Sequence, residues 1–289
     1  MICGIITKGI GGFYYVATDD GVAECRALGR LRKENITPVT GDRVKIRVTN
    51  KNPYEGAIEE VESRRNYLIR PPVSNIDMLV IVISTESPSP DYLMIDKLIA
   101  TAEYAKIEII IAVNKIDLAL PDEIVEIYKK AGFQTVKTCA QANIGIDKLK
   151  ALLTGRITAV AGNSGVGKSS ILNRFGLNLE TGEVGRTNRG RHTTRHTELL
   201  PLGNGKFVID TPGFSLLEVD DIKANELENY FREFANVGEC KFSDCAHIGV
   251  KADDCGVYNA VTKGEISKTR YESYENMYNF LKTIKEWEK

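Results

Sequence analysis

The chain has 289 residues, of which 43% are hydrophobic, and a formal net charge of −1. This length is typical of two or three domains, and the apolar content is sufficient for packed cores. The near-zero charge means that overall charge gives no indication of nucleic-acid binding. No apolar run approaches the roughly 20 residues of a membrane-spanning helix, and the first residues do not have the pattern of a signal peptide. We therefore expect a soluble, cytoplasmic protein.

Residues 1–70 contain short segments in which apolar and polar residues nearly alternate. The clearest segments, at 12–18, 21–28 and 42–49, are rich in β-branched and aromatic residues and are separated by turns. This spacing predicts a small β-barrel, with the OB-fold as the expected type. The region carries 12 Lys and Arg against 9 Asp and Glu, which is compatible with a phosphate backbone as its partner. A β module that serves only as a spacer or docking surface fits the same pattern.

After a stiff, extended connector at 70–75, the sequence pattern predicts an α/β domain. Its strands are continuous apolar runs, as in buried parallel strands, and stretches with helical spacing lie between them. This alternation predicts a mainly parallel sheet. The predicted strands are 77–85, 107–113, 134–140, 156–161 and 206–210, and the predicted helices are 91–105, 122–132, 147–153 and 169–175.

The stretch GNSGVGKS matches the phosphate-binding pattern G-x-x-x-x-G-K-S/T. It follows a predicted strand and begins a predicted helix, so backbone N–H groups and the helix N-terminus would face the phosphates. We expect Lys168 to reach the β- and γ-phosphates and Ser169 to bind Mg²⁺. A glycine-rich turn with an incidental lysine is the alternative. The residues predicted to bind the nucleotide here are Gly162, Asn163, Ser164, Gly165, Val166, Gly167, Lys168, Ser169 and Ser170.

The stretch NKID, residues 114–117, follows a predicted strand and indicates that the bound base is guanine. The carboxylate of Asp117 can accept hydrogen bonds from N1–H and from the N2 amino group of guanine. Adenine offers neither donor, so a buried Asp would lose its partners. We expect Asn114 to bond neighbouring groups and Lys115 to cover the ring.

Two shorter stretches complete the predicted nucleotide site. TCA ends a predicted strand, and Cys139 and Ala140 could bring a backbone N–H to the guanine oxygen. DTPG ends another predicted strand. There Asp210 could hold Mg²⁺ through a water molecule, and the Gly213 N–H could reach a γ-phosphate. Each stretch alone also fits an ordinary turn, so these predictions depend on the phosphate loop.

The order of these motifs is unusual, because the base motif precedes the phosphate loop. In most GTP-binding chains the phosphate loop comes first. When the two termini of a domain lie close together, the chain can be joined there and opened elsewhere. The order therefore predicts a circularly permuted P-loop GTPase domain.

Residues 219–289 have helical spacing of apolar residues at 223–238 and 268–289, around a cluster of metal-binding residue types. Three thiolates and one imidazole suit tetrahedral Zn²⁺ with no open coordination position, which is typical of a structural site. Ordinary cytosolic thiols are the alternative. The predicted ligands are Cys240, Cys245, His247 and Cys255.

Together these motifs resemble the ribosome small subunit-dependent GTPase A family (RsgA, also called YjeQ or YloQ). The resemblance covers essentially the whole chain and rests on RPPVSNID, NKID, GNSGVGKSS, GRHTTRHTEL, DTPGF and CKFSDCAH. It implies an OB-fold at 1–70, a circularly permuted GTPase domain at 71–218 and a helical zinc-binding domain at 219–289. It also implies binding to the small ribosomal subunit and its rRNA during late maturation, with GTP hydrolysis stimulated by that subunit.

The group that orients the attacking water is not obvious from the sequence. Many GTPases have a glutamine directly after the DxxG glycine, but this chain has Phe214. By the resemblance, His192 positions the water, and Thr194 is the switch threonine that binds Mg²⁺, with Thr193 as the alternative. Alternatively, His192 is simply an exposed loop residue without a catalytic role. The nearby arginines could stabilise the transition state, contact rRNA or form a solvated basic loop: Arg186, Arg189, Arg191 and Arg195.

These features predict a GTP hydrolase that acts in late small-subunit maturation and couples GTP hydrolysis to release of the subunit. The expected cofactors are GTP or GDP, Mg²⁺ and one structural Zn²⁺. The sequence has no strong dimer seam, so we expect a monomer with no membrane partner. The alternative is a nucleotide-gated rRNA-binding protein in which hydrolysis is incidental. Asp117 and the lack of a motif for a second substrate argue against a P-loop ATPase or kinase.

Overall fold

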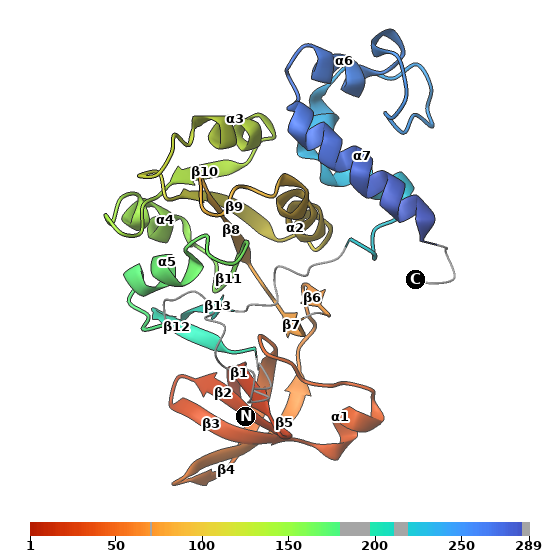
Figure 1. Ribbon diagram of the computed structural model, residues 1–289. Coiled ribbons are helices and arrows are strands. Elements are labelled where there is room, and N and C mark those ends of the chain that lie inside the picture. Colours follow the sequence, from red (N-terminus) through yellow and green to blue (C-terminus); the bar gives the residue numbers. More distant parts are fainter. Residues whose placement is uncertain (70, 180–196, 211–218, 285–289) are drawn as a thin grey trace, which may run out of the picture.

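In the computed structural model the chain forms a β-barrel, a central α/β sheet and a C-terminal helical unit, which follow one another along the molecule (Figure 1). The structure describes residues 1–69, 71–179, 197–210 and 219–284. Some predicted site residues lie outside these ranges, namely His192, Thr193, Thr194, Gly213, Phe214 and the four loop arginines.

The N-terminal strands form a closed barrel in the order β1-β2-β3-β5-β4. Strands β3 and β5 are parallel, and the other pairs are antiparallel. The barrel core consists of apolar side chains from alternating positions, including the fully buried Ile6, Val16, Val44, Ile46 and Ile58. This arrangement confirms the predicted OB-type barrel. Its elements are β1 (Ile2–Ile10), β2 (Phe13–Thr18), β3 (Gly21–Ala27), α1 (Gly29–Lys33), β4 (Arg43–Lys51) and β5 (Tyr54–Val61).

The central domain is a six-stranded sheet in the order β10-β9-β8-β11-β13-β12. All neighbouring strands are parallel except β12 and β13. The strands are β8 (Met78–Ser84), β9 (Glu108–Asn114), β10 (Gln134–Lys137), β11 (Ile157–Ala161), β12 (Leu199–Gly203) and β13 (Lys206–Asp210).

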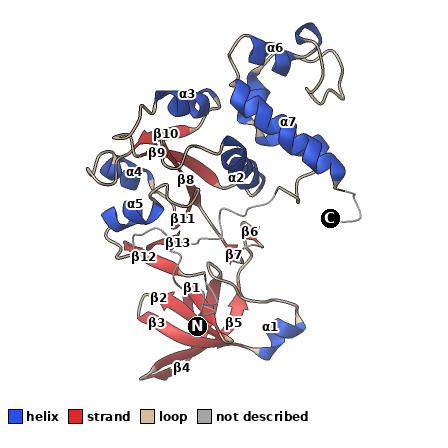
Figure 2. Ribbon diagram, viewed as in Figure 1, coloured by secondary structure: helices blue, strands red, loops and turns tan. Residues whose placement is uncertain are grey.

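Helices cover both faces of this sheet (Figure 2). Every residue of β8 is buried. Its alternating side chains enter two separate cores, with Leu79 and Ile81 on the face covered by α2 and α3, and Val80 and Val82 on the face covered by α4 and α5. This explains why the strand is continuously apolar from Met78 to Ile83. The helices are α2 (Tyr92–Tyr104), α3 (Asp122–Lys130), α4 (Ile146–Leu152) and α5 (Lys168–Arg174).

The strand order brings the sequence motifs to one edge of the sheet. The phosphate loop follows β11, the base motif follows β9 and TCA follows β10, and these strands are parallel within one sheet. The loops at the carboxyl ends of parallel strands lie at the same edge, where α/β proteins bind their ligands.

The segment predicted to be an extended connector is packed into the joint between the barrel and the sheet. It contains β7 (Val73–Ser74), which pairs with β6 (Tyr67–Leu68), and Val73 also forms a bridge with Thr40 of the barrel. Val73 and Ser74 are fully buried. The Ser74 hydroxyl donates to Asp42 at 2.6 Å, and Asp42 also pairs with Arg64 at 2.7 Å. These contacts fix the connector.

The C-terminal unit differs from its prediction at 223–238. In place of one α-helix, the structure has two 3₁₀ helices, η2 (Ala224–Tyr230) and η3 (Arg232–Asn236). They meet at Phe231, whose extended backbone (φ −115°, ψ 91°) interrupts the helical path. The Phe231 ring is 1% exposed and packs edge-on against Tyr274. Tertiary packing of this aromatic side chain outweighs the helical spacing. The remaining elements are η4 (Ala252–Asp254), α6 (Gly256–Thr262) and α7 (Lys268–Thr283).

A buried ionic cluster joins α7 to the central domain. The Arg270 guanidinium lies 2.7 Å from Asp96 of α2 and 2.7 Å from Glu233 of η3, and all three side chains are at most 4% exposed. The Tyr128 hydroxyl of α3 donates to Asp96 at 3.2 Å. The C-terminal unit is therefore docked on α2 by paired charges as well as by apolar contacts. Among the described residues, no helix is both long and apolar enough to cross a membrane.

Candidate nucleotide and metal sites

The loop between β11 and α5 has a backbone that requires glycine at several positions. Gly162, Gly165 and Gly167 have φ angles of 138°, 80° and 99°, in the region that residues with a Cβ rarely adopt. A Cβ at Gly162 would lie 2.3 Å from the Val82 carbonyl oxygen, and one at Gly167 would lie 2.3 Å from Asn114 Nδ2. The pattern of glycines therefore reflects close backbone approach as well as turn geometry.

Lys168 begins α5 and extends back over this loop. Its Nζ donates to the carbonyl oxygens of Gly162 and Asn163, both at 2.8 Å. The ammonium group is therefore held at the mouth of the loop. Ser169 and Ser170 follow in the first turn of α5, whose N–H groups have no acceptor within the helix and face the same mouth. This arrangement suits an anionic phosphate chain.

Asn114 connects the phosphate loop to the loops expected to bind the base. Its side chain is buried, with the residue only 2% exposed. Nδ2 donates to the Val166 carbonyl oxygen at 2.9 Å, while Oδ1 accepts from the Ala140 N–H and the Thr138 hydroxyl, both at 3.2 Å. The Ala140 N–H, one of the two TCA groups that could reach the guanine oxygen, thus has a protein acceptor in this structure. Three motifs that are distant in sequence are joined by one amide side chain.

Asp117 lies at the exposed end of this group. The Cys139 thiol donates to Asp117 Oδ1 at 3.1 Å, which orients the carboxylate. Lys115 has a positive φ of 60°, and its Nζ donates to the Ser87 carbonyl oxygen. The Thr85 hydroxyl donates to the Lys115 carbonyl oxygen at 2.6 Å. The base motif is therefore hydrogen-bonded to residues that follow both neighbouring strands, β8 and β10.

Two residues support the site although no sequence motif indicates this role for them. Thr138 bonds Asn114 as described, and Arg174, the last residue of α5, donates to the carbonyl oxygens of Ala140 at 2.7 Å and Gln141 at 2.9 Å. Arg174 thereby ties the helix after the phosphate loop to the TCA loop. A basic residue in the last turn of a helix indicates no such role, because its partners lie more than 30 positions away.

The magnesium and catalytic predictions fall mainly outside the described residues. The backbone of Asp210 ends β13 and is paired in register with Val160 of β11, so it lies one strand from the phosphate loop. His192, Thr194, Gly213 and the side chain of Asp210 are not described. Their roles stay predictions.

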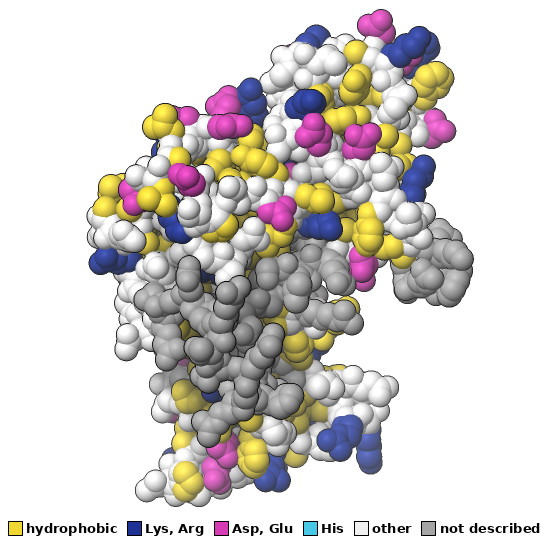
Figure 3. Space-filling view, viewed as in Figure 1, with side chains coloured by type: hydrophobic (Ala, Val, Ile, Leu, Met, Phe, Trp, Pro, Cys, Tyr) yellow, Lys and Arg dark blue, Asp and Glu magenta, His cyan; other side chains and the backbone are white. Residues whose placement is uncertain are grey.

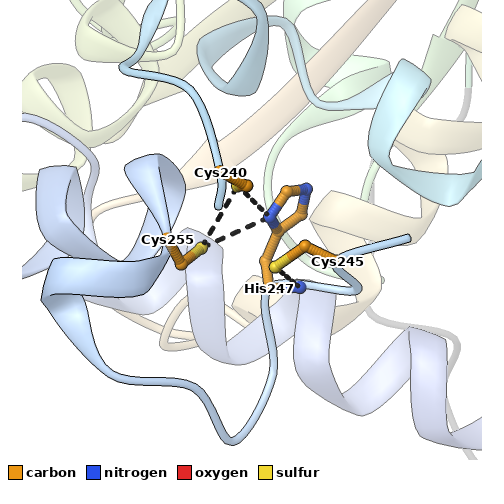
Figure 4. A group of neighbouring side chains, drawn as sticks. All are labelled: Cys240, Cys245, His247 and Cys255. Carbon is orange, nitrogen blue, oxygen red and sulfur yellow. Dashed lines mark hydrogen bonds between the residues drawn. The ribbon is translucent and has the colours of Figure 1, made fainter. Parts of the chain in front are cut away.

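The four predicted metal ligands converge in the C-terminal unit (Figure 4). Their ligand atoms all lie within 4.8 Å of one another. The Sγ atoms of Cys240 and Cys255 are 3.7 Å apart, and each lies 3.4 Å from His247 Nδ1. Tetrahedral Zn²⁺, with bonds of about 2.3 Å to sulfur and about 2.0 Å to nitrogen, requires separations of about 3.8 Å and about 3.5 Å. The ligand atoms of Cys240, His247 and Cys255 therefore have the separations that such an ion requires, and Cys245 Sγ lies within 4.8 Å of them.

The surroundings of the cluster act on its thiols in two opposite ways, because N–H donors favour the thiolate form and burial disfavours it. Backbone N–H groups of Tyr258 and His247 donate to Cys255 Sγ at 3.3 Å and to Cys245 Sγ at 3.4 Å. In the metal-free protein, burial and the neighbouring Cys240 thiol raise the pKa of Cys255 to about 12. A divalent cation displaces such a proton on binding, so metal affinity decreases as the pH falls.

Two family models match this chain. The family model for the RsgA GTPase matches residues 61–220, and the model for the RsgA N-terminal domain matches residues 3–58. The chain belongs to the RsgA GTPase family. It is therefore a GTPase, and its central domain is a circularly permuted P-loop GTPase fold.

Relatives match along nearly the whole chain. "Small ribosomal subunit biogenesis GTPase RsgA" of Caldanaerobacter subterraneus subsp. tengcongensis is 44% identical over 295 residues, covering 100% of this chain and 97% of its own length. The protein of the same name from Clostridium novyi is 45% identical over 290 residues, covering 98% and 96%. Among solved structures, YjeQ from Thermotoga maritima matches with a TM-score of 0.81 and 34% identity, covering 98% of this chain and 99% of the other. YloQ, described as a circularly permuted GTPase, matches with a TM-score of 0.79 and 34% identity, covering 99% and 96%.

Proposed function

We propose that this GTPase acts in biogenesis of the small ribosomal subunit, that the subunit stimulates GTP hydrolysis, and that hydrolysis accompanies release. The nucleotide site supports the GTPase part of the proposal, because the Asn114 side chain holds the phosphate and base loops together. The process is proposed because relatives that match the full length of the chain are named for it. We propose the cytoplasm as its location and a monomer as its working form.

We infer the following division of roles in the nucleotide site. Asp117 recognises guanine, with Cys139 orienting its carboxylate and Lys115 covering the ring. Lys168 and the backbone of 162–170 bind the phosphates. Mg²⁺, when bound, neutralises phosphate charge, and the residues that would hold it are Ser169, Thr194 and, through water, Asp210. The Gly213 N–H contacts the γ-phosphate, and His192 positions the attacking water.

The metal bound by the cluster is, in our proposal, one structural Zn²⁺. Cys240, Cys245, His247 and Cys255 provide four ligands, so no coordination position is left for a substrate. Metal binding then stabilises loops whose own apolar core is small. Metal analysis of protein purified without chelator should give about one zinc per chain. A protein without zinc would contradict the assignment.

The two outer parts are the proposed rRNA-binding modules, and we propose 1–70, 71–218 and 219–289 as the domain boundaries. Arg30, Arg32 and Lys33 of α1 are exposed, and Figure 3 shows Lys and Arg side chains gathered at that corner of the barrel. Such a cluster favours contact with a phosphate backbone.

The decisive experiment measures initial rates of GTP hydrolysis by the protein alone, with purified small subunits and with purified large subunits. We expect strong stimulation by the small subunit only. Normal GTP binding without stimulation would instead favour a nucleotide-gated rRNA-binding protein in which hydrolysis is incidental.

The role of His192 has its own test. The variant His192→Ala should lose subunit-stimulated turnover, because the water is no longer oriented, while the GTP dissociation constant changes little. His196→Ala, four positions further along the chain, is the matched control. Equal loss of turnover and of GTP affinity would refute the assignment.

A further inference from the structure

His247 has a polar partner on each side of its ring. Nδ1 faces the Sγ atoms of Cys240 and Cys255 at 3.4 Å, whereas Nε2 lies 2.6 Å from Oε2 of Glu228. The imidazole is only 8% exposed, and Glu228, which belongs to η2, is 44% exposed at its side chain. Glu228 is not one of the four clustered ligands.

The two ring nitrogens therefore have different roles. A neutral imidazole carries its proton on one nitrogen and a lone pair on the other. A carboxylate at 2.6 Å accepts the proton of Nε2, which leaves the lone pair of Nδ1 directed at the sulfur atoms. Metal-binding histidines commonly donate their second N–H to a carboxylate, which fixes the tautomer and increases the basicity of the ligand.

Other contacts hold both partners in place. The His247 ring packs edge-on against Phe234, with centroids 5.7 Å apart, and the Tyr271 hydroxyl donates to the His247 carbonyl oxygen at 2.7 Å. On the η2 side, Tyr230 stacks edge-on against Tyr104 of α2, with centroids 5.6 Å apart. The carboxylate therefore comes from an element that rests on the GTPase domain.

We propose that Glu228 is a positioning residue of the metal site, and that it anchors this site to η2. The element η2 begins at Ala224, only eleven positions after the glycine of DTPG. The metal loop is thus tied to the chain segment that leaves the GTPase domain, and not only to its own ligands. This inference rests on the proposed zinc site.

The first test compares zinc retention in the full-length protein. The variants are Glu228→Ala, Glu228→Gln and the control Glu226→Gln. Glu226 lies on the same 3₁₀ helix, is 42% exposed at its side chain and pairs only loosely with Lys223, at 3.7 Å. Zinc affinity is measured by competition with a coloured chelator, 4-(2-pyridylazo)resorcinol, and folding by circular dichroism in excess zinc.

We expect Glu228→Ala to weaken zinc binding about 10- to 100-fold, the usual effect of removing an outer-sphere partner. Glu228→Gln should weaken it less, because the amide oxygen still accepts from Nε2–H. Glu226→Gln should match the unmodified protein. Equal affinity in all four proteins would overturn the role of Glu228 and leave the zinc site intact. Absence of zinc from the unmodified protein would overturn both.

The second test reads the tautomer directly and does not depend on the alanine variant folding. Long-range ¹H–¹⁵N NMR distinguishes the two ring nitrogens of a histidine. The signals can be assigned easily because the chain has only three histidines. In the zinc-loaded protein we expect His247 to carry its proton on Nε2, with a strongly downfield Hε2 signal that moves upfield in Glu228→Gln. Metal binding through Nε2, or an Hε2 signal identical in both proteins, would overturn the proposal.

Discussion

Replacing Asn114 by alanine tests how the nucleotide site is assembled. The side chain bonds Val166 of the phosphate loop and both Thr138 and Ala140 of the TCA loop. The variant Asn114→Ala removes all three hydrogen bonds without touching the residues that are expected to contact phosphate or base. It therefore separates the positioning of the two loops from direct ligand contact.

The size of the effect follows from which groups lose a partner. The Thr138 hydroxyl keeps its bond to the Val113 carbonyl oxygen at 3.3 Å. The Val166 carbonyl and the Ala140 N–H lose theirs, and an unpaired buried group costs about 1–3 kcal/mol. Both loops lie at the open edge of the sheet, so their unpaired groups can partly reach water. We therefore expect a total free-energy cost below the maximum for two fully buried groups. A loss of about 2–3 kcal/mol weakens GDP binding about 30- to 150-fold.

The assay is equilibrium binding of a fluorescent GDP analogue, with urea unfolding as the check on stability. Thr138→Val is the matched control, because it removes one hydroxyl, whose single O–H is shared between Asn114 and the Val113 carbonyl oxygen, and leaves the other two bonds of Asn114. We expect less than about a fivefold loss in the control, since one neutral hydrogen bond contributes about 1 kcal/mol. A folded Asn114→Ala protein that binds GDP within about threefold of the unmodified protein would refute the reasoning.

Three further predictions concern other parts of the molecule. Arg270→Met should lower the free energy of unfolding by about 3–5 kcal/mol, because Asp96 and Glu233 remain buried without a cation; urea unfolding measures this, and a change below about 1 kcal/mol would contradict it. Asp117→Ala should abolish the preference for GTP over ATP in competition binding, with phosphate contacts kept; an unchanged preference would move base recognition elsewhere. Gly162→Ala should weaken GDP binding at least about tenfold, because its Cβ would lie 2.3 Å from a carbonyl oxygen; unchanged affinity would show that the loop adapts.

The sequence by itself determined the local chemistry. The features that it determined are short patterns made by neighbours along the chain. They are the glycines and lysine of the phosphate loop, the NKID stretch predicted to recognise the base, and the clustered cysteines. The parallel sheet followed from the same kind of information, because strands buried on both faces, such as β8, are apolar at nearly every position. The reversed motif order was enough to predict the permutation.

The tertiary structure decided which distant side chains meet. Asn114 reaches the carbonyl oxygen of Val166, 52 positions away, and Arg270 reaches Asp96, 174 positions away. The helical spacing at 223–238 predicted one α-helix, but the burial of Phe231 divides it into two 3₁₀ helices. Glu228 in this segment looks like any exposed acid until it is placed beside His247. A sequence pattern reports on the periodicity of one element, whereas these contacts depend on how elements pack, and burial makes them energetically significant.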